Sequence, residues 1–165
     1  MNRVFLHDGW ELTHCDVLPD HPAALAAADW RPAPVPGVVQ TSPFGLPRAE
    51  LYRETNVRSV EWMDQKYWVY RRRLDVPRIA ADETVRLRFA GLDYRYRILL
   101  DGKMVREEAG MFHPVDLALN AFAGQSPTVS VVFYPPPGAA ELFTNTKAFL
   151  GRGADFAPPL PTIGI

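Results

Sequence analysis

Two adjacent acidic residues, Glu107 and Glu108, are the first pair of side chains in this sequence that could do chemistry. Most enzymes that cleave a glycosidic bond use two carboxylates about 5 to 9.5 Å apart, one on each side of the bond. The pair follows Asp101-Gly102, a dipeptide typical of a hairpin turn, and neighbouring residues of a strand point to opposite faces of a sheet. We therefore interpret Glu107 and Glu108 as solvated surface residues.

The histidines are the next candidates, because an imidazole titrates near neutral pH and binds metal ions. The spacing of His7, His14, His21 and His113 fits no helical metal signature such as H-E-x-x-H. The sequence also lacks the G-x-S-x-G motif of a serine nucleophile and the glycine-rich motifs that bind phosphates. We predict no metal site, no cofactor and no catalytic residue in this chain.

Aromatic residues are a third group, with four Trp, six Tyr and nine Phe. Exposed rings can stack on the apolar faces of sugars, so a carbohydrate-binding module is one interpretation. Packing in a core is the interpretation that we favour for each ring. It applies most directly to four rings at strand positions, Trp68, Tyr70, Phe89 and Phe133.

Strands must position these side chains, because the proline content argues against long helices. The chain has 16 Pro in 165 residues, and each interior Pro costs a helix about 3 kcal/mol. Short runs of alternating apolar and polar residues predict strands at 67–74, 84–89, 94–100, 103–107, 112–119 and 128–134. Such a pattern predicts an all-β fold, an antiparallel β-sandwich with long Pro-rich loops and little helix. The only helix candidates are 22–28 and 139–150.

Composition narrows the function classes further. The 18 basic and 19 acidic residues give a formal net charge of −1, which argues against a strongly electrostatic nucleic-acid binder. No window approaches the roughly 20 apolar residues of a membrane span, and the first residues lack the apolar stretch of a secretory signal. The single cysteine, Cys15, permits a reducing compartment. We expect a cytoplasmic protein that binds neither nucleic acid nor membrane.

An ordered series of short motifs gives the sequence a resemblance to a known family. The motifs are 30–40 (WRPAPVPGVVQ), 45–47, 51–52, 56, 60–62 (VEW), 67–71 (YWVYR), 89–93 (FAGLD), 100–105 (LDGKMV) and 110–114 (GMFHP). In this order they resemble the N-terminal domain of β-mannosidase-like members of glycoside hydrolase family 2. The resemblance covers roughly residues 30 to 165. It implies a galactose-binding-like jelly roll, which agrees with the strand pattern.

The C-terminal segment carries the site that this resemblance implies. Residues 153–165 (GADFAPPLPTIGI) are similar to the family's G-W-D-W-G-P-R-L-x-T-x-G-I. In the family, that aspartate hydrogen-bonds a hydroxyl of the terminal sugar, so the resemblance assigns substrate binding to Asp155, with Phe156 beside it. Without the resemblance, Asp155 would be interpreted as a loop residue that makes an Asx turn. Ala154 and Pro159 replace a Trp and an Arg of the family, which leaves exo-glucosaminidase-type and other β-glycosidase substrates open.

The resemblance also implies the setting in which the chain works. We predict that residues 1–165 form one non-catalytic domain of a longer β-glycoside hydrolase. This domain would pack on the catalytic barrel of that enzyme. Its partners would be a terminal β-linked sugar and the remaining domains of that enzyme. A stand-alone carbohydrate-binding module and a purely structural scaffold are the alternatives. The family's final strand continues past Ile165, so an unpaired sheet edge could pair two copies, and a homodimer of the chain is a further expectation.

Overall fold

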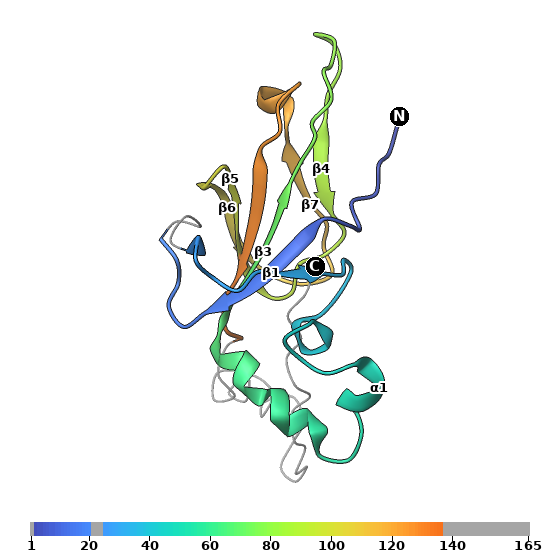
Figure 1. The fold of residues 1–165 in the computed structure, drawn as a ribbon. Helices are drawn as coiled ribbons and strands as arrows, with labels where there is room; N and C mark the ends of the chain where they lie inside the picture. The colour runs from blue at the N-terminus through green and yellow to red at the C-terminus, as the bar shows by residue number, and fades with distance from the viewer. Residues whose placement is uncertain (1, 21–24, 137–165) are drawn as a thin grey trace, which may run out of the picture.

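The computed structural model describes residues 2–20 and 25–136, and most of their regular structure is β-strand. The strands are β1 (Trp10–Cys15), β2 (Arg31–Ala33), β3 (Tyr67–Arg73), β4 (Arg86–Phe89), β5 (Arg95–Leu100), β6 (Lys103–Ala109), β7 (Val115–Ala118) and β8 (Thr128–Phe133). The helices are α1 (Arg48–Leu51) and the 3-10 helices η2 (Val39–Thr41), η3 (Asn56–Gln65) and η4 (Asn120–Phe122). Figure 1 shows α1 and η3 together at one end of the strands and η4 at the other.

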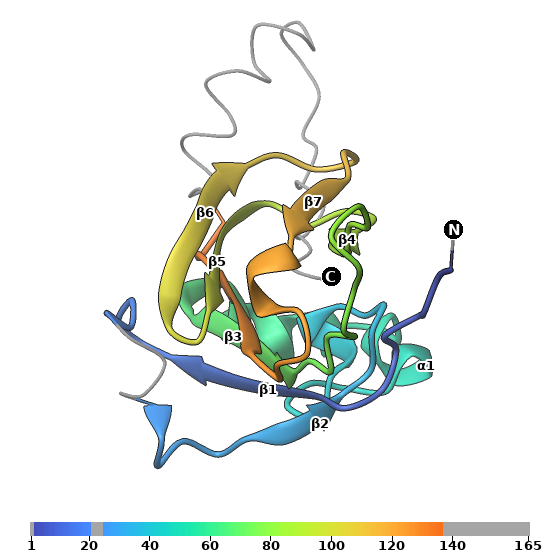
Figure 2. The ribbon, with the colours of Figure 1, turned by 90° about the horizontal axis from the view of Figure 1, so that it is seen from above.

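The strands form two antiparallel sheets that face each other. The larger sheet has six strands in the order β2-β1-β3-β8-β5-β6, and β4 pairs with β7 in the smaller sheet. Seen from above, the larger sheet curves, and β4 and β7 face its concave side (Figure 2). The expected all-β antiparallel sandwich with little helix is therefore confirmed.

Strand alternation sends one set of side chains into the space between the sheets. The four rings that the sequence places in the core are all buried: Trp68, Tyr70, Phe89 and Phe133. They pack against aliphatic side chains from both sheets, among them Leu12, Leu87, Ile98, Val115 and Val131. Full burial of one such side chain contributes about 1.5 to 3 kcal/mol. Apolar burial between the sheets is thus the main stabilising force of the fold.

The hairpin between β5 and β6 turns at Asp101 and Gly102, as the sequence predicts. Both residues have positive φ angles, 47° and 77°, the combination that matches the right-handed twist of paired strands. The Asp101 carboxylate also accepts a hydrogen bond from the backbone N–H of Thr128 at 2.7 Å. The turn is therefore tied to the first residue of β8, which helps to set the register of β5, β6 and β8.

The outer face of the larger sheet is covered in part by the segment that follows β1. Three side chains of this face are buried: Val69, Leu99 and Val132. Leu18, Leu25 and Trp30 pack over them. The Arg71 guanidinium lies 3.7 Å from the centre of the Trp30 ring and pairs with Glu11 at 2.7 Å. The larger sheet is thus apolar on both faces near its centre.

Parts of the fold differ from what the sequence predicts. β1, β2 and η3 were not expected, and the strand expected at 112–119 is limited to β7. η3 escapes pattern analysis because it buries only Val60 and Met63, too few apolar residues to mark a helical face. The helix candidate at 22–28 lies partly, and the one at 139–150 wholly, outside the described residues.

Two expected absences can be compared with the structure within residues 2–20 and 25–136. No helix there is long and apolar enough to cross a membrane. The same residues contain no group of three or more His, Cys, Asp or Glu side chains that could hold a metal ion.

Candidate functional site

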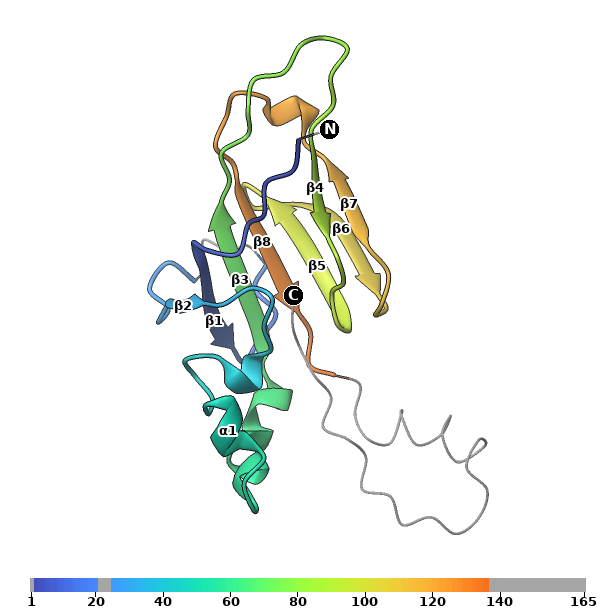
Figure 3. The ribbon, with the colours of Figure 1, turned by 90° about the vertical axis from the view of Figure 1, so that its right-hand side faces the viewer.

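One end of the sandwich is the end at which β8 finishes and the last described residues, 134–136, lie beyond the strands. We call it the exit end. In the register of the larger sheet, Trp68, Phe133, Tyr96 and Glu108 stand in one row across four strands. β3 and β5 begin near this row and β6 and β8 end near it, so Tyr134, Pro135 and Pro136 depart here. Figure 3 shows η3 and α1 extending past the strands on one side of this departure.

Glu107 and Glu108 lie at this end and point to opposite faces of β6, as strand alternation predicts. The Glu107 carboxylate accepts hydrogen bonds from the Tyr134 hydroxyl at 2.9 Å and from the guanidinium groups of Arg95 at 3.0 Å and Arg97 at 2.9 Å. The Arg95 guanidinium also lies 4.3 Å from the centre of the Tyr134 ring. The Tyr67 ring lies 5.6 Å from the Tyr134 ring, measured between ring centres. We call these five side chains the exit cluster: Tyr67, Arg95, Arg97, Glu107 and Tyr134.

The hydrogen-bond partners of the two glutamates favour their ionised forms. The hydrogen bond from Tyr134, with those from Arg95 and Arg97, lowers the pKa of Glu107 below its usual value. A hydrogen bond from Arg106 lowers the pKa of Glu108. The Glu108 carboxylate also accepts a hydrogen bond from the Tyr96 hydroxyl at 2.9 Å. A general acid needs a raised pKa. The prediction that this pair does not catalyse is consistent with both the geometry and the charge.

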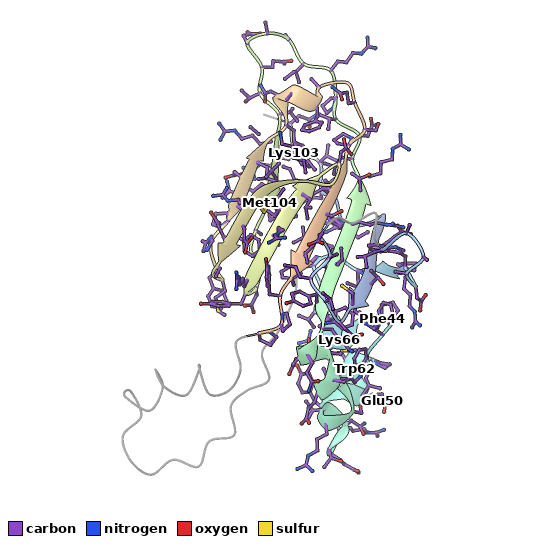
Figure 4. The ribbon with its side chains drawn as sticks, turned by 90° about the vertical axis from the view of Figure 1, so that its left-hand side faces the viewer. Phe44, Glu50, Trp62, Lys66, Lys103 and Met104 are labelled. Atoms are coloured by element: carbon purple, nitrogen blue, oxygen red, sulfur yellow. The ribbon has the colours of Figure 1, made fainter. Side chains whose placement is uncertain are left out.

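A second cluster lies at the same end, on the inner face of the sheet, and we call it the aromatic corner. It comprises His14 of β1, Trp68 of β3, Trp62 of η3 and Phe44 of the loop between η2 and α1. The His14 ring is 5.1 Å from Phe44, 5.2 Å from Trp62 and 5.1 Å from Trp68, measured between ring centres. Figure 4 shows Phe44, Trp62 and Lys66 gathered at this end of the molecule.

His14 is the centre of the aromatic corner and is held there in its neutral form. Burial lowers the pKa of His14, and the positive charge of Lys66 lowers it further. Lys66 is itself paired with the Asp16 carboxylate at the rim. A neutral imidazole among three rings packs as a flat, weakly polar group, so His14 acts here as a packed histidine.

Sequence reasoning missed the roles of Trp62, which reaches this corner on η3, and of Asp64, two residues further along the same helix. Trp62 is 37% exposed, and Trp68 donates a hydrogen bond from its indole N–H to the Met63 carbonyl at 2.9 Å. Burial raises the pKa of Asp64 to about 6, and the negative charge of Glu61 adds to the effect. The resemblance motifs at 56 and 60–62 were the only sequence signals for this helix.

The other predicted site residues are scattered or lie outside the described residues. A hydrogen bond of 2.9 Å links the Nδ1 of His7 and the Val35 carbonyl. His113 belongs to the loop between β6 and β7, whereas His21 lies outside the described residues. Asp155 and Phe156, the two predicted substrate-binding residues, also lie outside them.

An open cavity of about 540 Å³ lies beside β1 and β2, lined by His7, Asp8, Gly9, Trp10, Glu11, Pro32, Ala33 and Pro34. Its carboxylates do not form a catalytic pair, because Glu11 is engaged by Arg71 at 2.7 Å. The cavity therefore does not provide the two free carboxylates that glycosidic cleavage needs.

The fold defines a class, an antiparallel β-sandwich domain with two facing sheets. The chain belongs to the family described as glycosyl hydrolase 2 galactose-binding domain-like, which it matches over residues 10–151. The matched residues end before Asp155. The predicted family resemblance and the galactose-binding-like fold are thereby confirmed.

Curated relatives name one activity. The chain is 30% identical to beta-mannosidase B of Aspergillus niger over 113 residues, which are 66% of this chain and 13% of that protein. It is 36% identical to beta-mannosidase B of Emericella nidulans over 64 residues, 38% of this chain and 8% of that protein. The chain thus spans about an eighth or less of the length of these relatives.

Solved structures share the fold. A beta-D-mannosidase from Dictyoglomus thermophilum aligns with 90% of this chain and 18% of its own, with a TM-score of 0.59 at 22% identity. A GH2 beta-galacturonidase from Eisenbergiella tayi aligns with 79% of this chain and 19% of its own, with a TM-score of 0.52 at 19% identity. At such identities the likeness concerns the fold alone.

Proposed function

We propose that this chain is the non-catalytic N-terminal domain of a β-mannosidase-like glycoside hydrolase and packs on the catalytic barrel of that enzyme. The observation that carries the proposal is the family match over residues 10–151, together with relatives named beta-mannosidase B. The charge-paired state of Glu107 and Glu108 supports a role without catalysis. Hydrolysis would then be performed by residues elsewhere in the longer protein.

In this proposal Asp155 and Phe156 contribute to recognition of the terminal β-linked sugar. Support comes from the resemblance of residues 153–165 to the family's aspartate loop. A carboxylate suits the task, because its two acceptor oxygens can bind neighbouring hydroxyls, and a site built for a hydroxyl rejects analogues that lack it. Phe156 would offer an apolar face beside the sugar ring.

The test is Asp155→Ala in the longer enzyme. We expect kcat/KM on an aryl β-mannoside to fall by a factor on the order of 10², or ~3 kcal/mol of lost transition-state binding. Asp82→Ala is the matched control, because Asp82 is an exposed loop aspartate between β3 and β4. Unchanged kinetics of the Asp155 variant would refute the sugar-contact role.

A second candidate function is a carbohydrate-binding module that acts on its own. The observation in its favour is the aromatic corner, where Trp62 is 37% exposed beside three other rings. Titration of the chain with mannosides and galactosides, followed by tryptophan fluorescence, tests it. Saturable binding with Kd below ~10 mM, weaker in Trp62→Ala, would favour the module, and no such binding would remove it.

For cellular location we propose the cytoplasm. Support is limited to the single cysteine, Cys15, which is compatible with a reducing compartment. Fractionation of the native organism with an antibody against the chain tests the proposal, and recovery from the extracellular fraction would contradict it.

A further inference from the structure

Large apolar side chains are exposed mainly at one end of the molecule. At the exit end they are Val17, Tyr52, Trp62, Tyr94, Met111 and Phe112. Elsewhere in the described residues the exposed members are Val4 and Phe5 near the start of the chain and Met104 and Val105 near the start of β6. Single exposed apolar residues are ordinary on a protein surface, whereas a group of them marks an interaction site.

On one side of the chain exit, the group is built from the loops that precede β5 and follow β6. Gly110 donates its backbone N–H to the Tyr94 carbonyl at 2.9 Å, so the two loops are joined. Phe112 is 92% exposed and has a φ of 64°, in the left-handed region. Such a conformation costs a residue with a side chain about 1 to 2 kcal/mol. The structure thus holds a large ring in solvent at a conformational cost, which is common at functional surfaces.

On the other side of the exit, η3 and α1 supply Trp62 and Tyr52. Figure 3 shows these helices on one side of the departing chain and the ends of β4 and β5 on the other. The Trp62 ring packs against the Trp68 ring, with 6.0 Å between ring centres, and Trp62 is still partly exposed. Both sides of the exit therefore present rings on supported elements.

The exit cluster lies at the same end of the larger sheet, and its charges are already paired within the chain. The carboxylate of Glu107 is paired with Arg95 and Arg97, and it accepts a hydrogen bond from the Tyr134 hydroxyl. Burying a charge costs less when the charge keeps its partners than when it loses them. A surface with apolar rings and internally paired charges resembles a protein interface, which has an apolar centre and a polar rim.

The opposite end of the sandwich has a different surface. Its exposed residues include the charged Arg78, Asp82, Glu83, Asp101 and Lys103, and the only large apolar ones near the 101–102 turn are Met104 and Val105 among the described residues. Figure 4 shows Lys103 and Met104 far from Phe44 and Trp62, at the other end of the strands. The two ends of one sandwich thus differ in the surface that they offer.

We propose that the exit end is the surface that docks on a second folded domain of the same polypeptide. The proposal rests on the proposed function and names the part of the domain that makes the contact. The occupant follows from two observations: the described chain leaves the sandwich at this end, and the chain spans only 13% of its relative from Aspergillus niger. Covalent linkage raises the effective concentration of a partner domain, so a smaller apolar surface can dock it than a separate protein would need.

Thiol labelling at the two ends of β6 tests this assignment. In a Cys15→Ser background, Phe112→Cys places a thiol just beyond the end of β6 and Met104→Cys places the matched control near its start. Maleimide modification of each position is followed by peptide mapping, in the 165-residue chain and in the longer protein. We expect the thiol at position 112 to react at least ten-fold more slowly in the longer protein, and the thiol at position 104 to react equally in both.

Each outcome bears on one claim. Equal labelling of position 112 in the two proteins overturns the docking proposal and leaves the Asp155 experiment unaffected. Slow labelling at 112 in the 165-residue chain, relieved by dilution, overturns it in favour of a second copy of the chain. Where a cysteine variant fails to fold, hydrogen exchange of the unsubstituted proteins replaces it, with slower exchange at residues 110–113 but not at the 101–102 turn as the expected result.

Discussion

The exit cluster and the aromatic corner lie on opposite faces of the same sheet, and each includes one of two consecutive residues of β3. Tyr67 belongs to the first and Trp68 to the second. The exit cluster surrounds a carboxylate with two guanidinium groups and a hydroxyl, whereas the aromatic corner surrounds an imidazole with three rings. A one-residue step along β3 therefore separates a charge-paired surface from an apolar one.

The difference shows how each environment selects a protonation state. Donors around Glu107 stabilise its negative charge and lower its pKa. Near the aromatic corner, burial disfavours charge, so it lowers the pKa of His14 and raises that of Asp64 to about 6. The two regions should consequently respond in opposite ways to truncation and to pH.

Removal of Trp68, the fully buried ring of the aromatic corner, should have the largest effect. Trp68→Ala deletes a fully buried side chain that contacts three other rings, and large aromatic truncations in a core cost about 3 to 5 kcal/mol. Urea denaturation of the chain measures the loss. Trp62→Ala is the control, because the 37% exposed ring should cost roughly 1 kcal/mol. Equal losses for the two variants would mean that the corner does not have one buried anchor.

Asp64 gives the next largest effect, with a sign opposite to that of a paired carboxylate. Because its pKa is raised to about 6 in the folded state, folding favours the protonated form, and stability is lost as the pH rises through about 6. Asp64→Asn should therefore stabilise the protein at pH 8 by about 1 kcal/mol and have little effect at pH 4. Thermal denaturation at both pH values measures this.

Glu61→Gln sharpens the Asp64 experiment. The negative charge of Glu61 contributes to the raised pKa of Asp64, so its removal should lower that pKa without abolishing the shift, because burial is the larger cause. Carboxyl chemical shifts followed by NMR report the titration directly. A titration of Asp64 near its ordinary value of about 3.9 in the unsubstituted protein would contradict the assignment.

The exit cluster should show the smallest change in stability. Glu107→Gln removes a charge that two arginines and a tyrosine bind at a partly exposed site, and such pairs contribute about 1 kcal/mol or less. Because the pKa of Glu107 is lowered, its contribution is present above about pH 4.3 and is lost as the pH falls through the folded value. Urea denaturation at pH 7 and pH 3 tests this dependence.

Asp116→Asn is the matched control for Glu107→Gln. Its partner Arg88 lies 3.7 Å away on the smaller sheet and is more exposed than the arginines of the exit cluster, so we expect no measurable change. A loss equal to that of Glu107→Gln would show that the three donors around Glu107 add nothing to an ordinary surface pair.

Much of the sandwich could be predicted from local patterns. The runs 67–74, 94–100 and 128–134 correspond closely to β3, β5 and β8, because alternating apolar residues mark a strand with one buried face. Asp101 and Gly102 were predicted to turn the β5–β6 hairpin, because few dipeptides adopt two positive φ angles easily. The signals failed for β2, which has three residues, and for η3, which buries two apolar side chains.

The sequence by itself determined the strands, the burial of Trp68, Tyr70, Phe89 and Phe133, and the placement of Glu107 and Glu108 on opposite faces, since each depends on alternation within one strand. Only the tertiary structure decided which groups surround them. Arg95 and Glu107 come from two strands and Tyr134 directly follows a third, and His14, Phe44 and Trp62 come from a strand, a loop and a helix. The pKa values of Glu107 and His14, and the shared place of these groups at the exit end, depend on pairing between distant segments, and local spacing carries no record of that pairing.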